Sequence, residues 1–215
     1  LGLGLSPFLI LATDSVIIII MNTVLQHYGG PKEGDLLITC ATIVQSYMML
    51  ITGPMLGISS GTQAILSYNY GAKATRRVRK AERCILLLCL CFTSLMFLLS
   101  RIVPQYFIGI FTRDPGLTDL CIWGIHIFTL MIVPLSFQYV FVDGFTALGR
   151  SKTALFLSLF RKGDYVLFTM ILPIFYGARS AFYAQPLADG IAAVMSTVAF
   201  LLIFKKHLQK QEVSL

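Results

Sequence analysis

The stretch GPMLGISSGTQAILSYNYGAKATRRVRKAER, residues 53–83, decides the fold, because an apolar, glycine-spaced segment runs here directly into the most basic part of the chain. Six of the 17 Lys and Arg residues lie between Lys73 and Arg83. The apolar segments beside this cluster are long enough to span a membrane, and such clusters stay on the cytoplasmic side. The stretch therefore predicts a cytoplasmic loop between two spanning helices.

The composition is that of a lipid-embedded protein. Of the 215 residues, 56% are hydrophobic and 13% are charged, which is too apolar for an ordinary soluble domain. The formal net charge of +7 is confined to loops and the C-terminus, which favours attraction to anionic lipid and argues against nucleic acid as a partner. The five cysteines form no CxxC pairs, so neither a disulfide framework nor a zinc site is expected.

A spanning helix needs about 20 apolar residues. We expect one all-α integral membrane lobe over residues 1–215, with six spanning helices packed in a single bundle. They are expected at residues 3–25, 36–58, 84–108, 120–142, 153–175 and 184–204.

Charge counting predicts the orientation of this bundle. If the N-terminus is cytoplasmic, the inner loops and tail hold eleven Lys and Arg, among them Lys205, Lys206 and Lys210, and the outer loops hold four. The positive-inside rule then puts both ends in the cytoplasm of a cell-membrane protein. The chain starts at Leu1 inside an apolar run, so we expect that the sequence lacks its natural beginning.

Asp14 is the most informative single residue, because it lies in LILATDSVIIIIMN with apolar residues on both sides. A carboxylate in a spanning helix is costly and binds or relays cations by default. Asp14 is therefore our candidate for coupling, since it can take a proton or coordinate Na⁺, and either event neutralises it. The alternative is a structural pair with Ser15, Thr13 or an unseen lysine.

Three glycines, Gly53, Gly57 and Gly61, recur every four residues and predict a stripe where a neighbouring helix backbone packs closely. Beyond them, Gln63 and Asn69 are polar at a membrane boundary, where packing alone would be served by Leu or Ala.

A second polar group lies in MIVPLSFQYVFVDGFTALGRSK, residues 131–152. Pro134 should kink this span and free a carbonyl near the middle of the membrane. Gln138 and Asp143 follow, and we expect Asp143 to be an interfacial group near Arg150.

The last two expected spans also carry charges. Arg161 is expected to pair with Asp164 or stack on Tyr165, with the long side chains snorkelling, and Asp189 is expected to cap a helix at the outer interface. Aromatic and methionine residues could line a pocket for lipophilic cations; these are Tyr47, Met48, Met49, Met55, Phe137, Tyr139 and Phe141.

Several of these motifs resemble the multidrug and toxic compound extrusion family of transporters. The run G-x-x-x-G-x-x-x-G-x-Q followed by S-Y-N-Y-G-A-K and an Arg-rich tail is similar to the family's eighth-helix signature. The pattern F-x-A-L-G-R at residues 145–150 is similar to the end of its tenth helix, LFLSLFRK to its eleventh, and AQPLADG to the entrance of its twelfth.

The resemblance implies the C-terminal six-helix lobe of a twelve-helix antiporter that exports small lipophilic or cationic compounds by alternating access, coupled to Na⁺ or H⁺. Asp14 then lies where some sodium-coupled members carry Glu. Gln138 stands about where such members carry a carboxylate, which weakens the case for a complete sodium site. The polar residues expected at the cavity are Gln63, Asn69, Gln138, Tyr139 and Arg161.

The implied partners are membrane lipid and the missing N-terminal lobe, or a second copy of this one. Two alternatives stay open: a flippase of lipid-linked saccharides from the same superfamily, and a truncated membrane module that does not transport. No GxSxG motif, P-loop or Ser-His-Asp set is present, so we expect neither an enzyme nor a cofactor.

Overall fold

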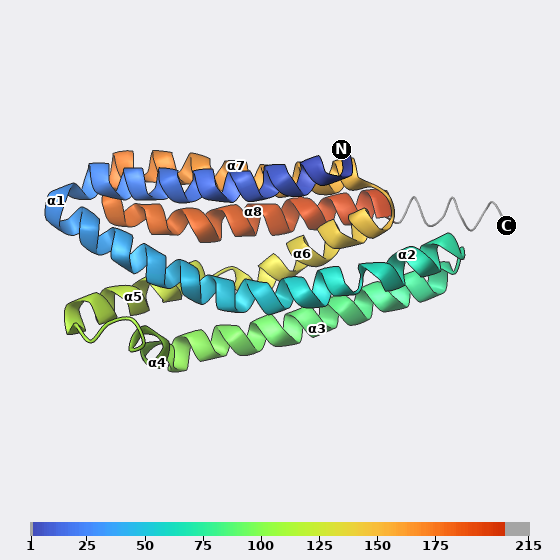
Figure 1. Ribbon diagram of the computed structural model, residues 1–215. Helices are drawn as coiled ribbons and strands as arrows, with labels where there is room; N and C mark the ends of the chain where they lie inside the picture. Colours follow the sequence, from blue (N-terminus) through green and yellow to red (C-terminus); the bar gives the residue numbers. More distant parts are fainter. Residues whose placement is uncertain (1, 205–215) are drawn as a thin grey trace.

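The computed structural model describes residues 2–204, and the side chains of residues 13–203. Its first helix, α1 (Gly2–Gly61), reverses direction at Gly30, where φ is 68° and ψ is −171° (Figure 1). This left-handed backbone region favours glycine, which has no Cβ to clash. Next to it, a Cβ on Gly29 would lie 2.8 Å from the backbone of Gly34, so both glycines permit the tight reversal.

The elements after α1 are also helical throughout the described residues. In chain order they are α2 (Gln63–Gly71), α3 (Thr75–Ile102), α4 (Pro104–Ile108), α5 (Pro115–Phe128), α6 (Ile132–Ala147), α7 (Ser151–Tyr176), the 3₁₀ helix η1 (Ala178–Tyr183), α8 (Ala184–Ala199) and the π-helical turn η2 (Phe200–Phe204).

The helices pack in two groups that share α1 and α6. The N-terminal half of α1 runs beside α7, which packs against α8, and the C-terminal half of α1 continues into α2 beside α3 (Figure 1). Helix α6 contacts both α3 and α8 and so joins the groups. The largest core cluster lies where α1 meets α5 and η1, with Phe128 and Phe182 in edge-to-face contact at 5.5 Å.

Three of the helical stretches are long and apolar enough to cross a membrane: Thr13–Gly71, Thr75–Ile102 and Ala178–Ile203. The bent pair α5 and α6 makes a fourth if it counts as one span. Helix α7 is not among them, because Arg161, Lys162 and Asp164 fall near its middle. The chain is an all-helical membrane protein, and the number of six spans stays a prediction.

The predicted kink in the fourth expected span is present. Helices α5 and α6 meet at an angle of 49°, and the break precedes Pro134, the third residue of α6. Proline has no N–H to donate to the carbonyl four residues earlier, which belongs to Leu130 in the break.

The glycine stripe, by contrast, faces away from the lobe. A Cβ on Gly53, Gly57 or Gly61 would have nothing within 4 Å, so the close helix packing expected there is wrong for the described residues. The buried stripe of this helix is shifted by two positions, to Met55 and Ser59. Spacing alone could not distinguish the two faces.

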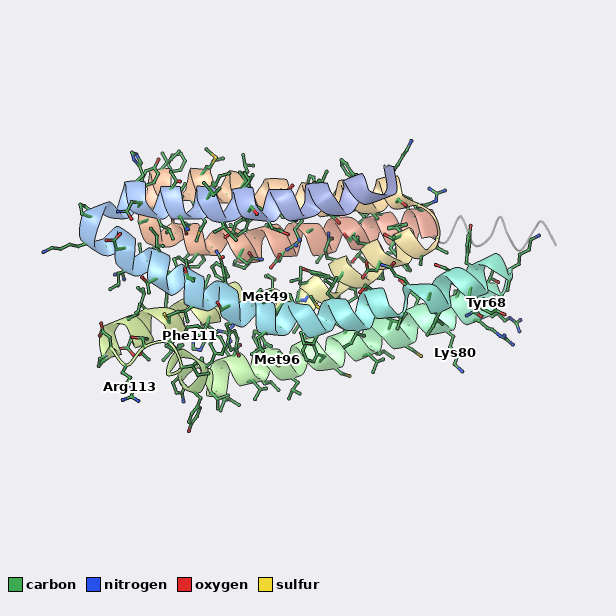
Figure 2. All side chains as sticks on the ribbon, in the orientation of Figure 1. Met49, Tyr68, Lys80, Met96, Phe111 and Arg113 are labelled. Atoms are coloured by element: carbon green, nitrogen blue, oxygen red, sulfur yellow. The ribbon has the colours of Figure 1, made fainter. Side chains whose placement is uncertain are left out.

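The basic residues of the segment 73–83 are all exposed, although the segment that was expected to be a loop is helical from Thr75 onward. Figure 2 shows Tyr68 and Lys80 at the end of the bundle where α2 turns into α3. The tail residues that entered the charge count, Lys205, Lys206 and Lys210, lie outside the described residues.

The fold predicts that Gly124→Ala destabilises the lobe. A Cβ there would lie 2.8 Å from Val44 Cγ2, 3.2 Å from Phe182 Cε1 and 3.3 Å from Cys40 Sγ, inside the largest core cluster. We expect a loss of about 1–3 kcal/mol in the free energy of unfolding, measured by thermal or denaturant unfolding in detergent. The matched control is Gly163→Ala, which has open space around it and should be neutral or stabilising by about 1 kcal/mol. Equal effects of both substitutions would contradict this packing.

Candidate functional site

A polar cavity of about 290 Å³ lies between the N-terminal half of α1, the C-terminal half of α1, and α6, α7 and α8. Its polar lining consists mainly of Asp14, Gln45, Tyr139, Arg161, Lys162 and Gln185. Met48 and Met49 supply part of the apolar wall, and Figure 2 shows Met49 about midway along the bundle. The cavity therefore brings the Asp14 carboxylate of α1 together with the charged residues of α7, Arg161 and Lys162.

Asp14 is held by a lysine that comes 148 positions later in the sequence. Lys162 Nζ lies 2.6 Å from Asp14 Oδ1, which joins α1 to α7. The lysine side chain is 7% exposed, whereas the aspartate side chain is 53% exposed. The pair thus has a buried cationic end and an accessible anionic end.

The neighbouring Arg161 turns to a different helix. Its Nη1 donates to Asp189 Oδ1 at 3.1 Å, and the second oxygen of that carboxylate accepts from Gln185 Nε2 at 2.7 Å. The guanidinium also lies over the ring of Tyr139, 5.6 Å from its centroid. Asp189 is fully buried, so Arg161 supplies the charge that compensates it.

Together these contacts make a cavity whose fixed charges cancel. Two consecutive cations of α7 reach in different directions, Lys162 to α1 and Arg161 to α8, and each meets one carboxylate. Of the two carboxylates, Asp14 is the accessible one, so a cation that enters the cavity competes with Lys162 for it.

Three expectations for these charges need correction. Arg161 pairs with Asp189 rather than with Asp164 or Tyr165 on its own helix. Lys162 does not snorkel, because its side chain is buried against Asp14. Asp189 is not a cap at the outer interface but an interior carboxylate of α8. In each case a partner on another helix replaces the local partner that sequence spacing suggested.

The five expected lining residues separate into different places. Tyr139 and Arg161 line the cavity. Gln138 is buried beside it, where its Oε1 accepts from Ser196 and its Nε2 donates to the Leu157 carbonyl at 3.3 Å. Asn69 donates to the Ile65 carbonyl of its own helix at 2.8 Å.

Gln63 belongs to a second polar group with Asp143. Its Nε2 donates to Asp143 Oδ1 at 2.8 Å, and Ser59 donates to Asp143 Oδ2. We expected Asp143 to be an interfacial group near Arg150, and the structure gives it partners on two other helices, so that it is a partly buried contact from α6 to α1 and α2.

Sequence reasoning missed Lys162 as the partner of Asp14, although the lysine sits in an apolar helix and carries the same cost of burial. It also missed Gln185, whose signal is its position four residues before Asp189 on α8. Among the described residues, no three His, Cys, Asp or Glu side chains converge to hold a metal ion. Sodium at Asp14 remains a prediction.

The family model described as MatE matches residues 8–171. The chain belongs to the MatE family. The match covers α1 to most of α7, and so includes Asp14, Arg161 and Lys162. A comparison with curated proteins gives no match.

Solved structures of MATE transporters have the same fold. An outward-facing multidrug resistance MATE transporter of the MOP superfamily matches with a TM-score of 0.84 at 17% identity, over 97% of this chain and 46% of that one. The inward-facing conformation of such a transporter gives 0.82 at 17% identity, over 97% of this chain and 47% of that one.

A third match is a MOP superfamily transporter from Pyrococcus furiosus, described as having a binding pocket of reversed polarity. It gives a TM-score of 0.83 at 17% identity, over 97% of this chain and 46% of that chain. The chain thus spans about half the length of the transporters it matches.

The site predicts that Asp189→Asn destabilises the lobe strongly, because the Arg161 charge then stays in the protein without its compensating carboxylate. We expect a loss of about 3–5 kcal/mol, measured by unfolding in detergent. The control is Glu33→Gln, which removes the exposed pair with Arg179 and should cost at most about 1 kcal/mol. A cost for Asp189→Asn as small as that of the control would contradict a structural role for the buried pair.

Proposed function

We propose that this chain forms one lobe of a secondary active transporter that exports small lipophilic or cationic compounds in exchange for Na⁺ or H⁺. The proposal starts from the membrane-transporter fold of the MatE family, which supports a role in transport. The observation that carries it is the half-exposed Asp14 carboxylate, which faces a cavity and is balanced by a buried lysine.

Coupling follows from competition at Asp14. A proton or Na⁺ that binds the carboxylate takes the place of Lys162 Nζ, and the buried ammonium then loses its contact with Asp14. This changes the energy of the contact between α1 and α7. A ligand shifts a conformational equilibrium only through such a differential interaction, and alternating access depends on that shift.

The cavity wall suits the proposed substrates. Arg161 already occupies a place over the Tyr139 ring, and Tyr165 and Phe128 add further aromatic surface. Aromatic faces attract organic cations, and methionine side chains adapt to apolar ligands of varied shape. Met48 and Met49 both line the cavity.

We place both ends of this segment in the cytoplasm of a multi-pass cell-membrane protein. The basic residues of the segment 73–83 are all exposed, which supports their assignment to the cytoplasmic surface. The second half of the transport path comes from an N-terminal lobe or from a second copy of this one, since the chain covers 46% of the transporter it matches.

A second candidate is a flippase of lipid-linked saccharides. The observation that favours it is the presence of two cationic side chains, Arg161 and Lys162, at the cavity. Both are paired with carboxylates, so the cavity has no excess positive charge for an anionic ligand. Efflux of neutral or cationic compounds therefore remains the better-supported function.

The test is Asp14→Asn in the natural protein that contains this chain, reconstituted into liposomes. Efflux of a fluorescent lipophilic cation, driven by an imposed Na⁺ or H⁺ gradient, should fall at least about fivefold, because the carboxylate that links ion binding to conformation is gone. Asp14→Glu keeps the carboxylate and should retain coupling. Glu33→Gln removes an exposed carboxylate outside the cavity and should leave efflux unchanged.

Gradient-driven efflux that persists undiminished in Asp14→Asn, with wild-type amounts of protein, would rule out Asp14 as the coupling group. Wild-type liposomes that fail to move the lipophilic cation but flip a lipid-linked saccharide would establish the second candidate. If neither compound moves, the chain is part of a membrane module that does not transport.

A further inference from the structure

A second pair of carboxyl groups lies away from the Asp14 cavity, where α1, α2, α3 and α6 meet. Glu82 is the eighth residue of α3, and Asp143 is near the end of α6. This is the end of the bundle where Figure 2 labels Tyr68 and Lys80, next to the basic segment 73–83. Neither carboxyl group belongs to the polar lining described above.

The two carboxyl groups have opposite hydrogen-bonding environments. Both oxygens of Asp143 accept hydrogen bonds, one from Ser59 and one from Gln63. Glu82 is 4% exposed, and neither of its carboxyl oxygens has a hydrogen-bond partner. Asp143 is thus equipped to hold a negative charge, and Glu82 is not.

Packing against Gly144 fixes the place of Glu82. A Cβ at Gly144 would lie 2.6 Å from Glu82 Oε1 and 3.2 Å from Glu82 Cδ, so the carboxyl group occupies the space that any other residue would fill. Because Gly144 has no side chain, the Glu82 carboxyl group fits between α3 and α6 at this position. Gly144 directly follows Asp143 in the sequence.

Neither carboxyl oxygen of Glu82 accepts a hydrogen bond from a cationic side chain among the described residues. Helix α6 brings Asp143 next to Gly144, and the groups that α1 and α2 supply to Asp143, Ser59 and Gln63, are neutral. The phenol of Tyr70 packs in the apolar cluster of this region, and the nearest basic residues of α3, Arg79 and Arg83, are exposed.

A buried carboxylate with no hydrogen-bond donor and a negative neighbour is far costlier than the neutral acid. Two carboxyl groups whose environments differ in this way take different roles, one protonated and one ionised. We propose that Glu82 and Asp143 form a proton-binding site, in which Glu82 holds the proton and Asp143, fixed by Ser59 and Gln63, holds the negative charge.

The site would exchange one proton with the side of the membrane that the basic segment faces. When α3 and α6 separate enough to admit water, the Glu82 O–H bond breaks, the proton passes to water, and the carboxylate is left hydrated. The reverse step restores the neutral acid before the helices close. Its use in transport rests on the proposed function, but proton binding itself does not.

Infrared difference spectroscopy of the natural protein in liposomes tests the proposal. The wild type should show a protonated-carboxyl C=O band at neutral pH that shifts in D₂O, and Glu82→Gln should lose this band. Glu33→Gln is the matched control and should keep it, because Glu33 is exposed and paired with Arg179. A wild-type spectrum without such a band, or a band that survives Glu82→Gln, overturns the proposal.

A second variant keeps the test decisive if Glu82→Gln does not fold. In Asp143→Asn the negative neighbour is gone, so the band should disappear at a lower pH than in the wild type. An unchanged titration overturns the proposed pairing. Addition of NaCl at constant pH should leave the band unchanged relative to KCl, whereas its loss in NaCl makes this a sodium site and overturns the proton assignment.

The outcome is distinguishable from failure of the proposed function. The infrared band reports proton binding with no transport step, so it can be present when Asp14→Asn leaves efflux intact. If both proposals hold, Glu82→Gln should lower proton-driven efflux by at least about fivefold.

Discussion

The lobe depends on the rule that a charge inside an apolar helix bundle needs a partner on another helix. Helix α7 carries two adjacent cations, and the structure places one against α1 and the other against α8. Removing either partner leaves a charge in a medium that cannot solvate it. The positions of three helices are therefore linked through two side-chain contacts, and both contacts contribute residues to the lining of the cavity.

Hydroxyl and amide groups extend this linkage through the interior. Thr93 pairs with Ser136 at 2.8 Å and Ser100 with Thr129 at 3.1 Å, joining α3 to α6 and to the break after α5. Such contacts satisfy polar atoms without introducing charge. The ionic pairs and the two carboxyl groups near the basic segment, in contrast, can change their protonation or their ion occupancy, so a chemical signal can enter the fold at these places.

Local features of the fold could be read from the sequence. Apolar length predicted the helical segments, and Pro134 predicted the bend between α5 and α6. The cost of burying a charge singled out Asp14, which has a lysine partner on another helix, while its coupling role stays a prediction. The inferences about helices and the bend succeed because they depend on the residue and its immediate neighbours in the chain.

Inferences about which helix faces and side chains contact one another in the folded chain failed. The glycine stripe and the apolar stripe of α1 have the same spacing, so periodicity could not tell which faces the core. Asp189 and Asp143 were given local or interfacial roles because their partners on other helices are far away in sequence. Glu82 stands among six basic residues in the segment that was predicted to be a cytoplasmic loop, whereas it is buried against Gly144. Asp14 and Lys162 form an ion pair although they are 148 positions apart in the sequence, and no rule based on helical spacing predicts such a pair.

The unequal burial of the carboxyl groups has a consequence for timing. Asp14 faces the cavity with half of its side chain accessible, so under the proposed function a bound ion exchanges after a rotamer change, which takes picoseconds to nanoseconds. Glu82 has no such route, and its exchange must wait for helices to separate, which takes microseconds to milliseconds. Under the two proposals, Asp14 therefore stays at equilibrium with its surroundings. Glu82 keeps the protonation state that it had when the helices last closed.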